Sequence, residues 1–257
     1  MLEADISRAV LVALRVGALM TFAPFFGNES VPNQVKAALT VLLTVLLLPV
    51  YISGPAPANL LSGGIAHWIM LALGEIAVGM MAGFTTQFVF DGMILAGQIA
   101  GFQFGFSLAN IIDPNSQVEI TVLSTLHELV ALLIFMEIGA HRWLLRAVAV
   151  SFRMVPLGAA ASGHLPAQEF LRISAAMWLI GAEIAFPVVL ATMIVDLTIG
   201  FLAKAAPQFP ALFFGISVKV LLGLAVMYGA VAFWPSLLGH YFYHALENLE
   251  RLLSLLH

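Results

Sequence analysis

Six charged side chains lie within or at the edge of apolar stretches, and their positions raise the possibility of proton or ion chemistry. They are Glu75, Asp91, Glu128, Glu183, Asp196 and Lys219. A charge at the middle of a bilayer costs at least about 2.5–3.5 kcal/mol, so such residues usually face protein or water and mark function. One interpretation is an ion relay, as in a transporter. The other, which is favoured because the carboxylates do not recur at helical spacing, is that these helices are buried in a larger assembly where charges pair or line a wet interior.

The usual patterns of catalytic and cofactor sites are missing from the sequence. His127 and Glu128 lack the second histidine, four residues on, that a zinc-protease helix needs. We find no phosphate-binding loop and no dinucleotide-binding glycine pattern. The chain has no cysteine, which excludes disulfides and thiol chemistry. The sequence therefore predicts a protein that is not an enzyme and that has no catalytic residues, cofactor or metal site.

A glycine-rich segment, "GQIAGFQFGFSLANIIDPNSQ" at residues 97–117, combines close packing with a polar end. Gly97, Gly101 and Gly105 fall on one helical register. Glycines at this interval let helix backbones approach closely, while each costs about 1 kcal/mol of helix stability relative to alanine. The segment also carries Phe102, Phe104 and Phe106, and it ends in the turn formers Asn110, Asp113, Pro114 and Asn115. It predicts a tightly packed helix that runs into a loop.

The composition is that of a membrane protein. Of the 257 residues, 61% are hydrophobic and only 9% are charged, against about 25% charged in an ordinary soluble domain. A soluble fold of this size leaves too much surface to hide so many apolar side chains. The sequence predicts an integral membrane protein or a component of a membrane-embedded assembly. The net charge of −4 gives no basic character, so nucleic acid is not an expected partner.

Hydropathy predicts an all-α fold of membrane-associated helical hairpins. Linkers rich in proline and glycine follow residues 52 and 155, and the second divides the chain near residue 160 into parts 1–160 and 161–257. The tail at 241–257 has leucines at helical spacing and is expected to be amphipathic. The other helical segments are expected at about 8–26, 37–52, 64–90, 93–112, 118–138, 141–154, 170–203 and 209–240.

These segments match simple bilayer spans poorly. A span needs about 20 apolar residues to cross about 30 Å of hydrocarbon, and 37–52 is short for this. The segment 170–203 would reach about 50 Å as one helix, although Pro187 is expected to kink it. Lysines and arginines do not sort onto alternate loops, so the sequence leaves the topology open.

One ion pair follows from the expected hairpin of 170–203 and 209–240. If the chain turns near Ala206 and Pro207, Asp196 lies about opposite residue 217. Lys219 is then only about 3 Å further along the axis. We therefore predict that the charged groups of Asp196 and Lys219 meet.

Several ordered blocks of the sequence resemble the FliR family of flagellar type III export-gate proteins. They are "R-x-x-x-L-M-T-F-A-P-F-F-G-N-E-S-V-P" from Arg15, "EIAVGMMAGF" at 75–84, "AGQIAGFQFGFSLA", "DPNSQ" and "GFLAKAAPQFPALFFGISVK" at 200–219. The resemblance runs from about residue 8 to about 240. Lys204 stands where members often have arginine, and Phe209-Pro210 replaces an asparagine-containing sequence, which affects the contacts of that turn.

The resemblance implies a place and a set of partners. A FliR-like protein stands beside FliP- and FliQ-like subunits in a helical funnel of the flagellar basal body, in the bacterial inner membrane, through which unfolded flagellar proteins pass. Its N-terminal part resembles FliP and its last hairpin resembles FliQ. An FlhB-like protein would contact the turn with Lys204, Pro207 and Gln208, and an FlhA-like protein is a further expected neighbour.

The resemblance also assigns a gate. In the family, the loop after the glycine-rich helix occupies the closed pore, and here that plug would be about Phe106 to Val118, with Asn110, Asp113, Pro114 and Asn115. The alternative is a plain connection between helices. Two other functions are open: the gate of a virulence type III secretion system, and a stand-alone secondary transporter that uses Glu75, Asp91, Glu183 and Asp196. Transporters typically show paired repeats, and none is evident here.

Overall fold

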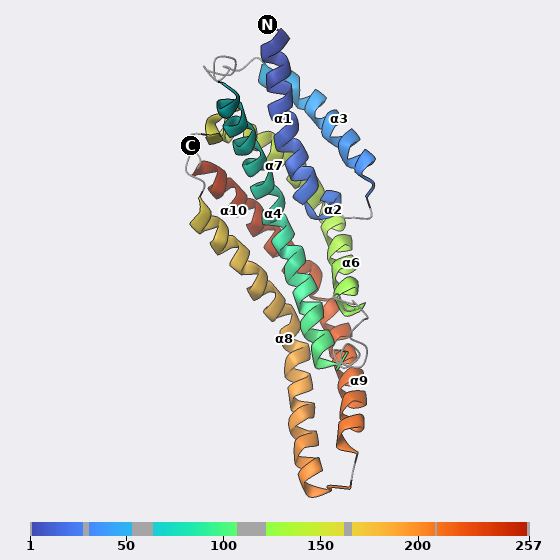
Figure 1. The fold of residues 1–257 in the computed structure, drawn as a ribbon. Helices are drawn as coiled ribbons and strands as arrows, with labels where there is room; N and C mark the ends of the chain where they lie inside the picture. Colours follow the sequence, from blue (N-terminus) through green and yellow to red (C-terminus); the bar gives the residue numbers. More distant parts are fainter. Residues whose placement is uncertain are drawn as a thin grey trace. The chain divides into compact units, whose positions relative to one another are not determined.

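The structure is a computed structural model that describes residues 2–27, 31–52, 64–106, 122–161, 166–208 and 210–255. All regular elements in these ranges are helices, so the predicted all-α fold is confirmed (Figure 1). In chain order they are α1 (Leu2–Phe22), α2 (Pro24–Gly27), α3 (Asn33–Ile52), α4 (Ile65–Gln103), α6 (Val122–Glu137), α7 (Ala140–Met154), the 3-10 turn η1 (Ala159–Ala161), α8 (Ala167–Ala205), α9 (Ala211–Val231) and α10 (Trp234–Ser254).

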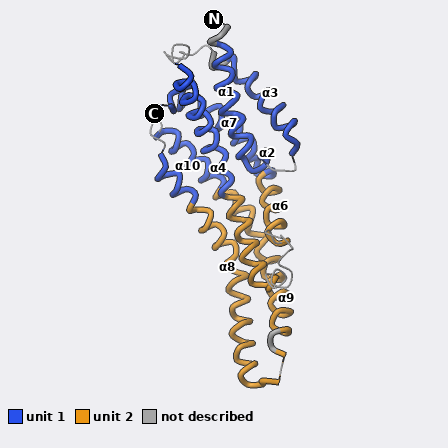
Figure 2. The backbone as a smooth tube through the Cα atoms, in the orientation of Figure 1, with its two compact units in different colours: residues 1–88, 136–174, 242–257 blue, residues 89–135, 175–241 orange. Residues whose placement is uncertain are grey.

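The chain forms two compact units, and each is assembled from separated parts of the sequence (Figure 2). Unit 1 contains Met1–Phe88, Met136–Ser174 and Phe242–His257. Unit 2 contains Val89–Phe135 and Ala175–Tyr241. Each unit therefore takes residues from both sides of position 160. The division into 1–160 and 161–257 rests on the linker that follows residue 155, and it stays a prediction.

Unit 1 has one large apolar core, to which α1, α4, α7 and α10 contribute most of the buried residues and α8 contributes Ile173. Along α1 the buried positions recur at the spacing of a single helix face, as expected for a helix packed on one side. Two glycines of α4, Gly79 and Gly83, bring α1 close: a side chain at Gly79 would run into the backbone carbonyl of Arg15, and one at Gly83 would meet the backbone of Phe22 at 2.9 Å. The core contains Val12, Val16, Leu19 and Met20 of α1, Val78, Met81 and Ala82 of α4, Leu144, Val148 and Phe152 of α7, and Leu249, Leu252 and Leu253 of α10.

Unit 2 is built around the second half of α4, with α6, α8 and α9. In this unit α8 and α9 form an antiparallel hairpin (Figure 1). Glycine again permits close approach, since a Cβ atom at Gly92 would lie 2.7 Å from the side chain of Ile180. Phe90 and Phe135 stack edge to face, with ring centroids 5.5 Å apart.

Two predicted boundaries are wrong. The segments 64–90 and 93–112 are one helix, α4, which continues through Asp91 and Gly92 and ends at Gln103. One glycine costs only about 1 kcal/mol in a helix, and packing of Gly92 against Ile180 outweighs that cost.

The predicted segment 209–240 is likewise divided, because α9 ends at Val231 and α10 begins at Trp234. Pro235 lies in the first turn of α10, where a missing N–H is tolerated. The expected helical tail is confirmed as the continuation of α10.

Three helices among the described residues are long and apolar enough to cross a membrane: α4, α8 and α9. The bent pair of α6 and α7 adds a fourth if it counts as one span. Apolar side chains cover the outer faces of α8 and α9, including Leu190, Leu197, Phe201, Phe213 and Leu221, all at least half exposed on this chain. This surface suits lipid or other apolar helices rather than water.

Candidate functional site

The helix α4 ends in a C-terminal capping motif at Gly105, directly before the predicted gate segment. Gly105 has a φ of 82°, the left-handed conformation that side chains disfavour. Its N–H donates to the carbonyl of Phe102 at 3.0 Å, and the N–H of Phe106 donates to the carbonyl of Gly101 at 3.1 Å. These two bonds form a Schellman motif, the usual glycine-based helix stop. Gly105 was predicted to pack against a helix, and this assignment is wrong, because the residue lies past the helix end and turns the chain.

The three phenylalanines at this stop divide into one anchor and two exposed rings. Phe104 is 1% exposed and its ring lies on Gly223 of α9, where any side chain would overlap it. Phe102 is 71% exposed and Phe106 is 44% exposed. The rings of Phe104 and Phe106 meet edge to face at 6.1 Å. The helix end that precedes the predicted gate segment is therefore held in unit 2 by one buried ring, with two exposed apolar rings beside it.

Gly97 packs as predicted. A Cβ atom there would lie 2.5 Å from the Cα atom of Ser124, so the backbones of α4 and α6 are in direct contact. Gly101 is also buried. The helices α4 and α6 precede and follow the gate segment in the chain. The predicted gate residues Asn110, Asp113, Pro114 and Asn115 lie outside the described residues.

A buried ion pair joins α1 to α4 in unit 1. The side chains of Arg15 and Glu75 are 1% and 0% exposed, and Arg15 Nε donates to Glu75 Oε2 at 2.6 Å. The second carboxylate oxygen, Oε1, accepts a bond of 2.8 Å from the backbone N–H of Gly158. Both oxygens of a buried carboxylate are thus satisfied, as burial of a charge requires.

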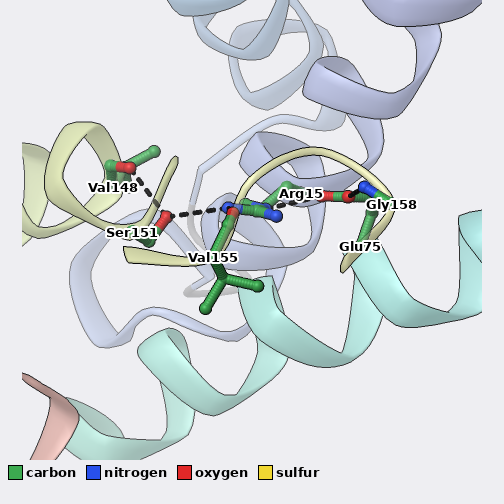
Figure 3. Close-up of polar contacts among 6 residues, drawn as sticks. All are labelled: Arg15, Glu75, Val148, Ser151, Val155 and Gly158. Carbon is green, nitrogen blue, oxygen red and sulfur yellow. Dashed lines mark hydrogen bonds and ion pairs between the residues drawn. The ribbon is translucent and has the colours of Figure 1, made fainter. Parts of the chain in front are cut away.

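The same arginine extends the network to α7 and to the turn that follows it (Figure 3). Arg15 Nη1 donates to the carbonyl of Val155 at 3.0 Å and lies 3.4 Å from Ser151 Oγ. The guanidinium carbon stands 4.2 Å from the ring centroid of Phe152, which is a cation–π contact. One side chain of α1 therefore holds α4, α7 and the turn together.

The predicted pair of Asp196 and Lys219 is confirmed: Lys219 Nζ and Asp196 Oδ1 form an ion pair across the hairpin of α8 and α9. Burial of Asp196 in a larger assembly stays a prediction, and on this single chain Asp196 is exposed. Its side chain is 51% exposed, whereas that of Lys219 is 19% exposed. In the structure this part of α8 has α9 on one side and leaves an open face on the other (Figure 1).

Exchanging the charges of Asp196 and Lys219 tests whether this ion pair contributes to stability. Asp196→Lys places two ammonium groups side by side and should lower the thermal stability of the detergent-solubilised protein. The swapped double variant Asp196→Lys/Lys219→Asp should recover most of the loss, because it restores opposite charges at the same positions. Exposed pairs contribute up to about 1 kcal/mol, so a melting difference of a few degrees is expected. Equal melting of the single and double variants would show that the pair contributes nothing.

Glu183, in α8, is exposed rather than buried, and it accepts a hydrogen bond from the phenol of Tyr241 in α10. Burial, and then the hydrogen bond and charge of Glu183, raise the pKa of Tyr241 to about 12. The phenol therefore stays protonated and keeps its role as donor. Asp91 is half-buried on α4. Glu75, Asp91, Glu183 and Asp196 thus do not form one cluster. Among the described residues, no group of three His, Asp or Glu side chains could hold a metal ion.

The turn between α8 and α9 carries the predicted partner-facing residues. Lys204 lies in the last turn of α8, which ends at Ala205, and Pro207 and Gln208 follow in the turn. All three are exposed. Phe209 lies outside the described residues.

Sequence reasoning missed the partners of two carboxylates, Glu75 and Glu183. Arg15 interrupts an apolar run just as Glu75 does, so opposite charges in two buried helices were the available signal. The sequence contained no signal for the contacts of Ser151 and of the Gly158 amide, because neither residue is unusual among its sequence neighbours. Tyr241 was also missed, because a single tyrosine in a helix is common and nothing in the sequence connects it with Glu183.

Known proteins match this chain over almost its full length. The family of bacterial export proteins, family 1, matches residues 6–245. The flagellar biosynthetic protein FliR of Escherichia coli (strain K12) is 32% identical over 217 residues, which cover 83% of this chain and 80% of that protein. FliR of Pectobacterium carotovorum subsp. carotovorum is 26% identical over 244 residues, 94% of this chain and 90% of the relative. FliR of Bacillus subtilis (strain 168) is 26% identical over 250 residues, 96% and 94% of the two chains.

The matched region includes Arg15, Glu75, the glycine-rich part of α4 and the hairpin of α8 and α9. The likeness is therefore one of the whole fold and not of a shared motif. The chain belongs to the FliR family of bacterial export proteins and is a component of flagellar type III protein export.

Proposed function

We propose that this chain is a structural and gating subunit of the flagellar export channel, and that its gate is the segment from about Phe106 to Val118. The observation that carries the proposal is the helix stop at Gly105. It ends a 39-residue apolar helix abruptly, and it presents two exposed phenylalanines where the segment begins. Unfolded flagellar proteins would pass when the segment moves aside. No chemical step is assigned to the chain itself.

The way the segment is attached supports a gate that opens without unfolding the subunit. Phe104 is buried on Gly223, and Gly97 holds α4 against α6, so both ends of the segment start from packed helices. Between them the sequence offers Asn110, Asp113, Pro114 and Asn115, which favour turns over regular structure. Segments with few buried contacts open at low cost, and a gate made of turn-forming residues would be of this kind.

The outer surface supports assembly with other subunits. The helices α8 and α9 expose rows of large apolar side chains together with Asp196 and Glu183. A carboxylate in an apolar surface needs protein or water around it. We propose FliP- and FliQ-like subunits as the neighbours, an FlhB-like protein at Lys204, Pro207 and Gln208, and an FlhA-like protein nearby. The place of the assembly would be the flagellar basal body in the bacterial inner membrane.

Deleting residues 110–116 tests the gate. The shortened protein should assemble normally, because the deletion removes no residue of the described helices, and its membranes should leak ions or small solutes. Solute entry into cells or vesicles is the measurement. The matched control deletes seven residues, 55–61, from the proline-containing linker before α4, and it should not leak. Normal assembly with unchanged permeability would show that 106–118 is a plain connection.

The partners are tested by purifying the tagged chain from its own membranes. Companions that resemble FliP and FliQ should elute with it in fixed proportion. Recovery of the chain alone, together with solute uptake when it is placed by itself in liposomes, would favour a transporter instead.

A further inference from the structure

The helix α7 carries a basic stripe that neither the gate nor the ion pair uses. Arg142, Arg146 and Arg153 are separated by four and seven residues. At about 100° per residue these spacings bring them within a sector of about 40° on one side of the helix. All three side chains are exposed. We call these three residues the arginine stripe.

The opposite side of α7 is fixed in unit 1. Ala140, Leu144, Ala147, Val148, Ser151 and Phe152 are buried there. The arginine stripe is therefore the outward side of a helix whose rotation is set by its core. It extends over about 16 Å of helix axis.

No acidic group of the surrounding chain neutralises the stripe. Residues 138–168 contain no Asp or Glu, although the protein as a whole has 14 acidic residues and only 10 lysines and arginines. Within the described part of the chain, the ion pairs involve Arg15, Arg172, Lys219 and His244 but none of the three stripe arginines. The stretch 138–168 therefore has three positive charges and no acidic residue, in a protein of net charge −4.

The position of α7 in the chain points to a membrane surface. The apolar helix α6 precedes it and the apolar 39-residue helix α8 follows. The helix α7 is bent by 69° from α6, and an amphipathic helix that turns away from an apolar neighbour in this way suits the boundary of lipid and water. Trp143 stands beside the stripe and its ring meets that of Tyr243 edge to face at 5.4 Å. Tryptophan and tyrosine favour the headgroup level of bilayers.

We propose that the arginine stripe binds the headgroups of anionic phospholipids at the surface of the bilayer. Guanidinium groups pair with phosphate through two parallel hydrogen bonds, and a helix with arginines on its polar face is typical of interfacial attachment. An acidic protein partner could bind the arginines by charge alone and would not require aromatic or apolar groups beside them. The aromatic pair and the apolar helices on either side favour lipid. The proposal does not depend on the identity of the gate.

The test compares lipid binding by two sets of variants of the full-length chain. Arg142→Gln/Arg146→Gln/Arg153→Gln removes the stripe, and Arg172→Gln/Arg251→Gln removes exposed cations elsewhere. Lipid retained by the detergent-solubilised protein is measured with phosphatidylglycerol and with phosphatidylcholine. The wild type should prefer phosphatidylglycerol, and salt should weaken this preference. Each arginine near an anionic surface changes binding by about fivefold, so the triple variant should lose about 100-fold of the preference and the control variant should keep it.

A second measurement does not depend on the stability of the triple variant. The chain has no cysteine, so Ala149→Cys, on the same side of α7 as the stripe, accepts a single fluorophore. In bilayers its emission should be quenched by spin labels on lipid headgroups more than by labels on acyl chains. The control, Leu221→Cys on the exposed side of α9, should show the reverse.

Four results would overturn the proposal. Wild-type protein that binds the two lipids equally would do so, as would a triple variant that keeps its preference for phosphatidylglycerol. A triple variant that keeps the lipid preference but loses companion subunits on purification would assign the stripe to an acidic protein. A fluorophore at residue 149 that no lipid label quenches would place α7 away from the bilayer.

Discussion

The variant Glu75→Ala is expected to lose about 3–5 kcal/mol of folding stability. The change leaves the guanidinium of Arg15 buried without the carboxylate that it contacts at 2.6 Å. It also removes the acceptor of the Gly158 amide. An uncompensated buried charge is among the costliest defects in a protein interior. A membrane protein with so large a loss should fall to a small fraction of its wild-type level, because the unfolded chain is degraded.

The pair offers its own internal controls. Arg15→Met/Glu75→Leu removes both charges and fills the space with apolar groups, so it should be less harmful than either single change. Glu250→Ala removes an exposed carboxylate of α10 and should leave stability almost unchanged. Protein level in membranes and thermal melting in detergent are the measurements. If Glu75→Ala melts with the wild type, the ion pair does not hold unit 1 together.

The variant Gly97→Ala is expected to destabilise unit 2 by about 1–3 kcal/mol through overpacking. The new Cβ atom would lie 2.5 Å from Ser124 Cα and 2.7 Å from the Ser124 backbone nitrogen. These neighbours are backbone atoms, so no side-chain rotation relieves the overlap and α6 has to move. The helix propensity of alanine returns roughly 1 kcal/mol, which leaves a net loss. Because α4 and α6 bracket the gate segment in the chain, secretion of flagellar proteins should fall as well.

The matched controls make the same substitution where there is room. Gly200 in α8 and Gly229 in α9 have nothing within 4 Å of the position of a Cβ atom. Gly200→Ala and Gly229→Ala should therefore stabilise the isolated chain by roughly 0.5–1 kcal/mol. Melting temperatures in detergent compare the three variants directly. A Gly97→Ala variant as stable as these two would show that α4 and α6 are not in close contact.

Helix positions were predictable from the sequence because the apolar pattern of each helix is local. The positions of α3, α6 and α7 follow their apolar runs closely, whereas α1 begins at Leu2 and ends at Phe22 instead of covering 8–26. The continuity of α4 did not follow, because the packing there comes from a residue distant in the chain, whereas the start of α10 had a local signal in Pro235. Packing of Gly92 on Ile180 keeps α4 continuous where sequence alone suggests a break.

The gate region was predictable in part. The sequence identified the glycines, the phenylalanines and the turn residues that follow them. It could not separate Gly97, which packs against a helix, from Gly105, which stops one, since both have the same spacing. Only backbone conformation distinguishes them, through the φ of 82° at Gly105. Likewise, the alternation of Phe102, Phe104 and Phe106 did not reveal that only Phe104 is buried.

The two ion pairs show what sequence and tertiary structure each decide. Asp196 and Lys219 belong to one hairpin with a short turn, so counting residues from the turn was enough to bring them together. Arg15 and Glu75 are 60 residues apart, and their further partners at Ser151, Val155 and Gly158 are more distant still. Composition determined that such buried charges need partners, because an apolar interior does not solvate them. The partners themselves were decided only when α1, α4 and α7 packed around one core.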